Sequence, residues 1–216
     1  MATYVETATT VTDTEPVGLF TEGAAGIAAI ALAIIALAGV STTDLTSIAV
    51  IVIGVGLVVQ GFNTAAESMR QPLAGGIAEF GGEVMVDCLA GGAGIVLGIL
   101  ALIGLHPEYL LAPALIEFGA ALMLSGALAM RSRIAMPGPA GSMQMVALPG
   151  SAATGGVELL MGIAAAVLGI LALTMPAHAV LLLVGFIIIG AALLIVSATF
   201  GAALMSVLST SRVAAE

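Results

Sequence analysis

Six long apolar runs are the feature that most constrains what this chain can fold into. They lie at 23–40, 45–63, 86–105, 109–130, 157–175 and 178–206. A helix needs roughly 20 apolar residues to cross the hydrocarbon core of a bilayer. Only 8% of the residues are charged, which is too little polar surface to cover a soluble domain of this length. The sequence therefore predicts an all-α integral membrane protein with six transmembrane helices.

The connections between the runs alternate in length. Three are short, at 41–44, 106–108 and 176–177, and two are long, at 64–85 and 131–156. This alternation predicts three helical hairpins joined by two linkers. The expected hairpins are 23–63, 86–130 and 157–206, preceded by an acidic tail at 1–22 and followed by a short tail at 207–216. The second linker is rich in proline and glycine, which is typical of an irregular loop, and the first has room for a short interfacial helix.

The hairpins also resemble one another in sequence. Val86–Ala127 aligns with Val157–Ala198 without a gap, and nearly half of the aligned residues are identical. Both segments contain the string Val-Leu-Gly-Ile-Leu-Ala-Leu, and the first hairpin places a similar string, 32–37, in the same register. Ungapped agreement across two helices and their turn indicates three copies of one hairpin.

The four arginines predict the orientation of the chain. Arg70 lies in the first linker, Arg131 and Arg133 open the second, and Arg212 lies in the last tail. All four therefore fall on one side of the membrane. By the positive-inside rule this side is cytoplasmic. We therefore expect a cell (inner or plasma) membrane protein with both termini in the cytoplasm and the short turns on the outer side.

The charge balance excludes several classes of partner and site. A formal net charge of −9 with no lysine argues against nucleic acid. The same acidic, lysine-poor composition fits either a salt-adapted cell or a high-GC genome. One cysteine, Cys88, excludes an intramolecular disulfide and a cysteine metal cluster. The sequence carries no motif for a catalytic nucleophile, nucleotide, metal or haem, so we expect neither catalysis nor a cofactor.

Small residues recur in register along the predicted helices and mark where these helices approach closely. The odd helices carry Ala25, Ala29 and Ala33, then Ala90, Gly94 and Gly98, then Met161, Ala165 and Gly169. The even helices carry Gly54 and Gly61, Gly119 and Gly126, and Gly190 and Ser197. We call these positions the small-residue seam and interpret them as helix-packing positions.

One register carries an acid in every repeat: Glu22, Asp87 and Glu158. Each acid lies on the same helical face as the seam, so it is expected to point toward protein. Two interpretations stay open. The acids could be stabilised by the positive ends of their helices, or they could form a cation- or proton-binding ring at the cytoplasmic mouth of the bundle.

Glu117 has no acidic counterpart in the other repeats and lies near the middle of its predicted helix. An ionisable residue inside a membrane is a functional-site hypothesis by default. Pro113, four residues earlier, cannot donate a hydrogen bond to the carbonyl of Tyr109. Tyr109, Pro113 and Glu117 therefore form a candidate site, with a protonated Glu117 bonded across an interface as the structural alternative.

The predicted outer side carries few titratable residues. Obvious ones are His106, His178, Glu108 and Asp44. Histidine titrates near neutral pH, so the pair could sense external acid. The two histidines do not share a repeat register, however, and the alternative is that both are simply solvated.

The third hairpin resembles the HdeD-type family of short-repeat prokaryotic membrane proteins. The resemblance rests on Gly162-Ile163, the string 168–173, Pro176 after the first helix, and Gly185 and Gly190 in the second. In the second hairpin the proline is shifted to Pro107, and the first hairpin lacks a turn proline. Membership would imply three hairpins, six spans, no catalytic residue and an association with acid or other stress.

Three classes of function follow from these observations. The first is a non-catalytic, stress-associated membrane protein of the HdeD type. The second is an anchoring or scaffold subunit that binds a partner membrane protein or further copies of itself. The third is a small proton- or cation-coupled transporter or channel that uses Glu117 and the acid ring, which is disfavoured because Glu117 is the only deep ionisable residue in six spans.

Overall fold

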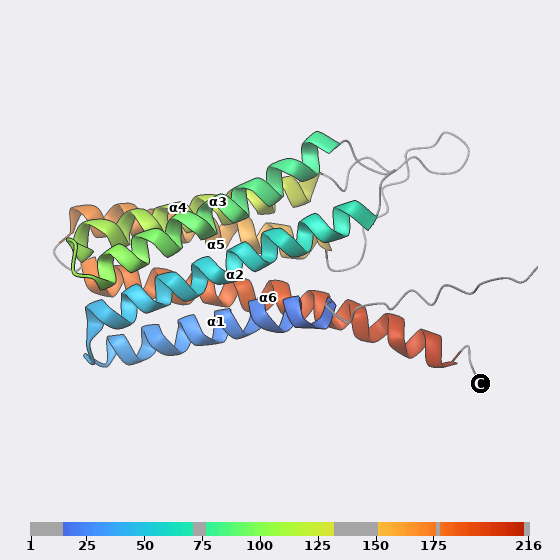
Figure 1. Ribbon diagram of the computed structural model, residues 1–216, viewed down its shortest axis with the longest axis horizontal. Helices are drawn as coiled ribbons and strands as arrows, with labels where there is room; N and C mark the ends of the chain where they lie inside the picture. Colours follow the sequence, from blue (N-terminus) through green and yellow to red (C-terminus); the bar gives the residue numbers. More distant parts are fainter. Residues whose placement is uncertain (1–14, 71–76, 132–150, 176–177, 214–216) are drawn as a thin grey trace, which may run out of the picture.

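In a computed structural model the described part of the chain forms helices and short turns. It comprises residues 15–70, 77–131, 151–175 and 178–213, with side-chain surroundings given for 21–63, 65, 84–128, 130, 155–175 and 178–198. The helices are α1 (Glu15–Leu37), α2 (Thr42–Arg70), α3 (Ile77–Leu102), α4 (Pro107–Arg131), α5 (Ser151–Thr174) and α6 (His178–Val213) (Figure 1). The all-helical fold class is confirmed over these residues.

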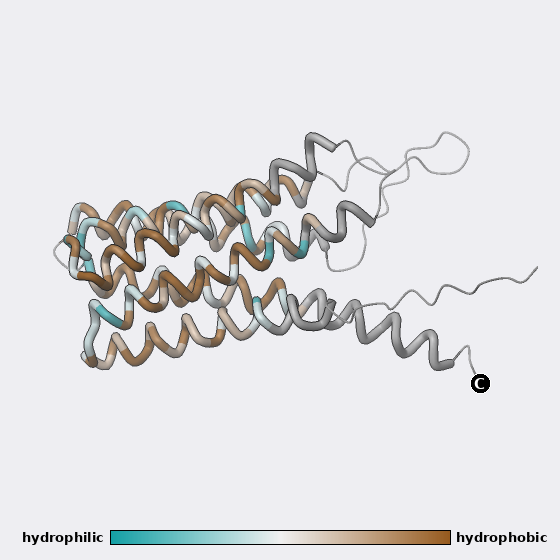
Figure 2. Tube along the Cα trace, viewed as in Figure 1, coloured by the Kyte–Doolittle hydropathy of each residue, from teal (hydrophilic) through white to brown (hydrophobic). Residues whose placement is uncertain are grey.

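Five of these helices are long and apolar enough to cross a membrane. The spans are Thr42–Asn63, Val84–Leu102, Pro107–Leu128, Gly155–Thr174 and His178–Ala198. The apolar part of α1, Thr21–Leu37, is shorter than these five. Brown, hydrophobic stretches dominate the bundle in Figure 2. The fold is thus membrane-like, with five candidate spans among the residues with described side chains, where the sequence predicted six.

The helices extend further than the apolar runs. Helix α2 continues to Arg70 and α3 begins at Ile77, so most of the predicted linker 64–85 is helical. Likewise α1 begins at Glu15 and α6 continues to Val213, within the predicted tails. Helices continue past an apolar run because good helix formers such as glutamate and alanine extend the backbone hydrogen bonds. Residues 1–14 and 132–150, most of the first tail and of the second linker, lie outside the described residues.

The first two turns have the same backbone geometry at aligned positions. Gly39 and Gly104 have φ angles of 88° and 87°, and Ser41 and His106 have φ angles of 36° and 42°. In both turns the glycine N–H donates to a carbonyl three residues back, Ala36 or Ala101, at 3.0 Å. Glycine is favoured just past a helix end because this left-handed conformation carries no steric penalty for it.

The six helices form a closed ring, and three of them, α2, α4 and α6, lie toward its centre. Helices α2, α4 and α6 contact one another, and each of α1, α3 and α5 packs against two of them. The most extensive contacts lie between successive hairpins, at α2–α3 and α4–α5, and α1 against α6 closes the ring. The helix ends beside the short turns gather at one end of the bundle, and the opposite ends of the helices lie at the other (Figure 1).

The centre of the bundle is filled by large apolar side chains of the inner helices. Those that are fully buried include Ile53, Leu57, Leu115, Phe118, Leu122, Phe186 and Leu193. The inner helices are accordingly more buried than α3 and α5. The outer helices expose large apolar side chains such as Ile27, Leu89 and Leu160. An apolar exterior around a filled apolar core is suited to lipid.

Candidate functional site

Pairs of glycines bring successive hairpins into backbone contact. A Cβ atom added at Gly54 would lie 2.7 Å from the carbonyl oxygen of Gly91. The corresponding distance is 2.8 Å from Gly119 to Gly162 and 2.9 Å from Gly190 to Gly26. All three distances are shorter than real Cβ contacts. The contacts join α2 to α3, α4 to α5 and α6 to α1, so the seam glycines of the even helices connect different hairpins.

Other seam positions lie at similar contacts. An added Cβ would meet backbone of the preceding hairpin at Gly98, 3.0 Å from the Ser47 carbonyl, and at Gly169, 3.1 Å from the Ile116 nitrogen. At Gly126 it would lie 2.7 Å from the Gly155 carbonyl. Gly94 is an exception, because the space beside it is filled by the Phe118 ring of its own hairpin. The small-residue seam did not include Gly26, Gly91 and Gly162, although these three positions are aligned in the repeats.

The three acids of the predicted ring are all buried in the bundle. Only 3% of the Glu22 surface, none of Asp87 and 7% of Glu158 are exposed. They lie two or more turns inside α1, α3 and α5. Stabilisation by the helix N-terminus therefore does not account for them, because this effect is confined to the first turn.

Electrostatic interaction links these acids to one another. The Glu22 carboxyl group interacts with those of Glu158 and Asp87. Asp87 also accepts a hydrogen bond from the Ser125 hydroxyl at 3.4 Å. The fold thus brings together three acids from three different hairpins.

Sequence reasoning did not single out the other buried polar residues at this end of the inner helices. Gln60, Ser125 and Ser197 are buried. Gln60 and Ser125 each directly precede an aligned seam glycine, Gly61 or Gly126. The available signal was that Gln60 and Ser125 place a polar residue at the same repeat register within apolar runs. Ser197 was assigned to the seam for its size alone.

The second candidate site, Tyr109–Pro113–Glu117, lies on the outer face of α4. Tyr109 is 67% exposed, Pro113 is exposed and Glu117 is half-buried. Leu124 lies on the same face of α4, and 51% of its surface is exposed. We call this face the exposed stripe of α4. Helix α4 runs through Pro113 without interruption. The structure does not bring Glu117 together with the buried acids.

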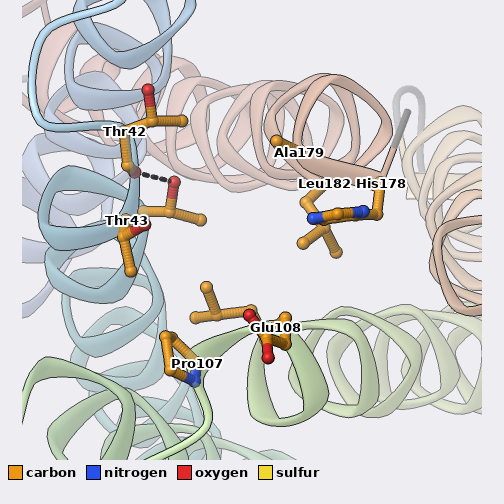
Figure 3. A pocket seen from close by; sticks show the side chains of 9 residues that line it. Thr42, Thr43, Pro107, Glu108, His178, Ala179 and Leu182 are labelled. Atoms are coloured by element: carbon orange, nitrogen blue, oxygen red, sulfur yellow. Dashed lines mark hydrogen bonds between the residues drawn. The ribbon is translucent and has the colours of Figure 1, made fainter. Parts of the chain in front are cut away.

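A small cleft of about 80 Å³ lies between the first turns of the three inner helices. It is lined by Thr42, Thr43, Thr46, Pro107, Glu108, Leu111, His178, Ala179 and Leu182 (Figure 3). The Thr46 hydroxyl donates to the carbonyl of Thr42 across one turn of α2. His178 and Glu108 reach this cleft from α6 and α4, whereas His106 packs edge-on against Tyr109. The two histidines of the predicted sensor therefore have different surroundings.

Among the residues with described side chains, no three histidine, cysteine, aspartate or glutamate residues are placed to hold a metal ion. Comparisons of the whole chain with protein-family models, with curated proteins and with solved structures found no match.

Proposed function

We propose that this chain is a non-catalytic, multi-pass membrane protein whose six helices cross the bilayer as three repeated hairpins, and that it has a stress-associated role of the HdeD type. The apolar exterior supports membrane insertion, because exposed side chains such as Leu89 and Leu160 favour hydrocarbon over water. These two residues occupy aligned positions on α3 and α5.

Equivalent contacts support the repeat. The glycine pairs Gly54–Gly91, Gly119–Gly162 and Gly190–Gly26 are related by the same alignment that relates the hairpin sequences. The matching φ angles of the first two turns add a second, independent correspondence.

The filled interior is the observation that carries the non-catalytic assignment. Ile53, Leu57, Phe118 and Phe186 are fully buried in one apolar core. Between the inner helices, Leu115 of α4 lies against Gly185 of α6, and Leu193 of α6 lies against Gly56 of α2. In a bundle enzyme or an open channel this space is where a substrate, cofactor or water column lies. Here aromatic and branched aliphatic side chains occupy it.

A survival assay tests the stress role. Cells that lack the gene are shifted to acid and compared with cells complemented by the wild-type gene. We expect reduced survival in acid and equal growth at neutral pH. Equal survival of both strains in acid, with the protein shown to be expressed in the complemented cells, would remove the stress role.

A scaffold role is the second candidate, and the exposed stripe of α4 favours it. A half-buried carboxyl group at Glu117 between exposed Pro113 and Leu124 is costly in lipid and less costly against a protein partner. Pull-down of tagged protein in mild detergent, followed by mass spectrometry, separates the two roles. A stoichiometric partner favours the scaffold, and recovery of the tagged chain alone counts against it.

A further inference from the structure

Each of the six helices contributes one buried polar side chain near the linker end of the bundle. These residues, which we call the polar layer, are Glu22 on α1, Gln60 on α2, Asp87 on α3, Ser125 on α4, Glu158 on α5 and Ser197 on α6. Two other buried polar residues, Thr46 and Ser47, lie near the turn end of α2. They are therefore at the opposite end of the bundle from the polar layer.

Contacts between neighbouring helices place these residues at one level. Gly23, next to Glu22, faces the Ser197 hydroxyl of α6, which would lie 2.9 Å from an added Cβ. Gly61, next to Gln60, faces Cys88, which follows Asp87 on α3.

The remaining helices meet at the same level. Gly126, next to Ser125, faces α5, because a Cβ atom added at Gly126 would lie 3.1 Å from the Cβ atom of Glu158. The hydrogen bond from Ser125 to Asp87 joins α4 to α3. The three acids thus lie within one cross-section of the bundle rather than at different depths.

Among the residues whose side chains are described, the polar layer contains three acids and no positively charged side chain. Glu22 is 97% buried, yet its Oε1 atom has no hydrogen-bond partner. Three ionised carboxylates in this position would repel one another and lose most of their hydration, at a cost of several kcal/mol per ion.

Protons are the cations that best fit this arrangement. A metal ion needs several oxygen ligands at 2.0–2.6 Å around one point, and the described acids are not grouped in that way. A proton instead needs one carboxyl oxygen and a nearby acceptor. The orphan Oε1 of Glu22 can carry a proton, and the other two carboxyl groups lie within electrostatic range.

We propose that the polar layer is an internal proton-binding site, in which Glu22 holds at least one proton at neutral pH and shares it with Asp87 and Glu158. This inference concerns the interior of the bundle and does not depend on the stress or scaffold role proposed above. The other described titratable group at this level is Cys88, while Gln60, Ser125 and Ser197 on the inner helices do not titrate. Loss of the bound proton places repelling charges beside the tight contacts at Gly23, Gly61 and Gly126, so it loosens the bundle.

Infrared spectroscopy of the full-length protein tests the proposal directly. In a Glu117→Gln background, the carbonyl stretch of protonated carboxylic acids is recorded in detergent at neutral pH. We expect a band that weakens in Glu22→Gln, in Asp87→Asn and in Glu158→Gln, and that disappears in the triple variant. Asp44→Asn, which removes an exposed acid from the first turn of α2, is the control and should leave the band unchanged. A missing band, or one that survives the triple substitution, would overturn the proposal.

Thermal unfolding as a function of pH gives a second measurement. The folded protein holds at least one proton that the unfolded chain releases above about pH 4, so the unfolding temperature of the wild type should fall as the pH rises from there. The triple variant should lose most of this dependence and the Asp44→Asn control should keep it. The same slope in all proteins would contradict the proposal. Recovery of stability at high pH on addition of sodium or calcium would also contradict it, in favour of a metal site.

Discussion

At Glu117 the side chain lies outside the packed interior, half-buried on the same stripe of α4 as Tyr109 and Pro113. The sequence predicted a deep ionisable residue from its position in an apolar run. The helix turns it toward the outer surface, because it lies roughly 200° around α4 from Gly119, which packs against α5. In the proposed membrane arrangement, Glu117 would therefore face lipid or another protein surface.

Two substitutions at Glu117 distinguish an interface acid from a transport residue. Glutamine keeps a hydrogen-bond donor and acceptor, so Glu117→Gln should associate in detergent like the wild type. Leucine keeps neither, so Glu117→Leu should weaken association by about 1–3 kcal/mol, measured by analytical ultracentrifugation. Identical association of all three proteins would remove the interface role. Wild-type proton flux in liposomes that a stably folded Glu117→Gln variant loses would instead favour the transporter.

At the scale of the element, the glycine contacts determine how closely neighbouring helices pack. A Cβ at Gly119 would lie 2.6 Å from the backbone nitrogen of Ala166, which cannot move aside as a flexible side chain could. By contrast, nothing lies within 4 Å of the position that a Cβ would take at Gly92 in α3. The two glycines therefore form a matched pair. Replacing either by alanine changes helix propensity equally, but only Gly119 is tightly packed.

Alanine at these two positions should have opposite effects on stability. Gly119→Ala should destabilise the bundle by about 1–3 kcal/mol through overpacking, and Gly119→Leu should destabilise it further. Gly92→Ala should be neutral or stabilising by up to about 1 kcal/mol, because alanine favours the helix. Thermal unfolding in detergent measures both. Equal tolerance of alanine at the two positions would show that close approach at Gly119 contributes nothing.

At the scale of the whole molecule, successive helices run in opposite directions, so the helix ends beside the short turns lie at one end of the bundle and the helix ends on the linker side lie at the other (Figure 1). Helices α2 and α4 end at Arg70 and Arg131, on the linker side. By the positive-inside rule we expect the linker side to be cytoplasmic, which would place the polar layer nearer the cytoplasmic side and the cleft of Figure 3 outside.

Cysteine labelling tests this orientation. In a Cys88→Ala background, which removes the one native cysteine, a membrane-impermeant reagent added from outside should modify Thr43→Cys. It should modify Ser142→Cys only after the membrane is permeabilised. The reverse pattern would overturn the orientation inferred from the arginines.

Much of the fold was predictable because its signals are local. Runs of apolar residues specify helices, and the spacing of short and long connections indicates hairpins. The alignment of 86–127 with 157–198, together with the register of the first hairpin, anticipated that Gly54, Gly119 and Gly190 would have equivalent surroundings. Helix ends were less accurate, as at Arg70 and Ile77, since hydropathy marks the apolar run and not the last hydrogen-bonded turn.

The partner of each helix had to come from the tertiary structure. A row of glycines specifies that some helix approaches closely but carries no information about which one, and here it is a helix of the next hairpin, with α6 returning to α1. The polar layer depends on the same fact. Glu22, Asp87 and Glu158 share a register in the sequence, but only closure of the ring buries them together with Gln60, Ser125 and Ser197. Burial is a property of all six helices at once, so no single helix could specify it.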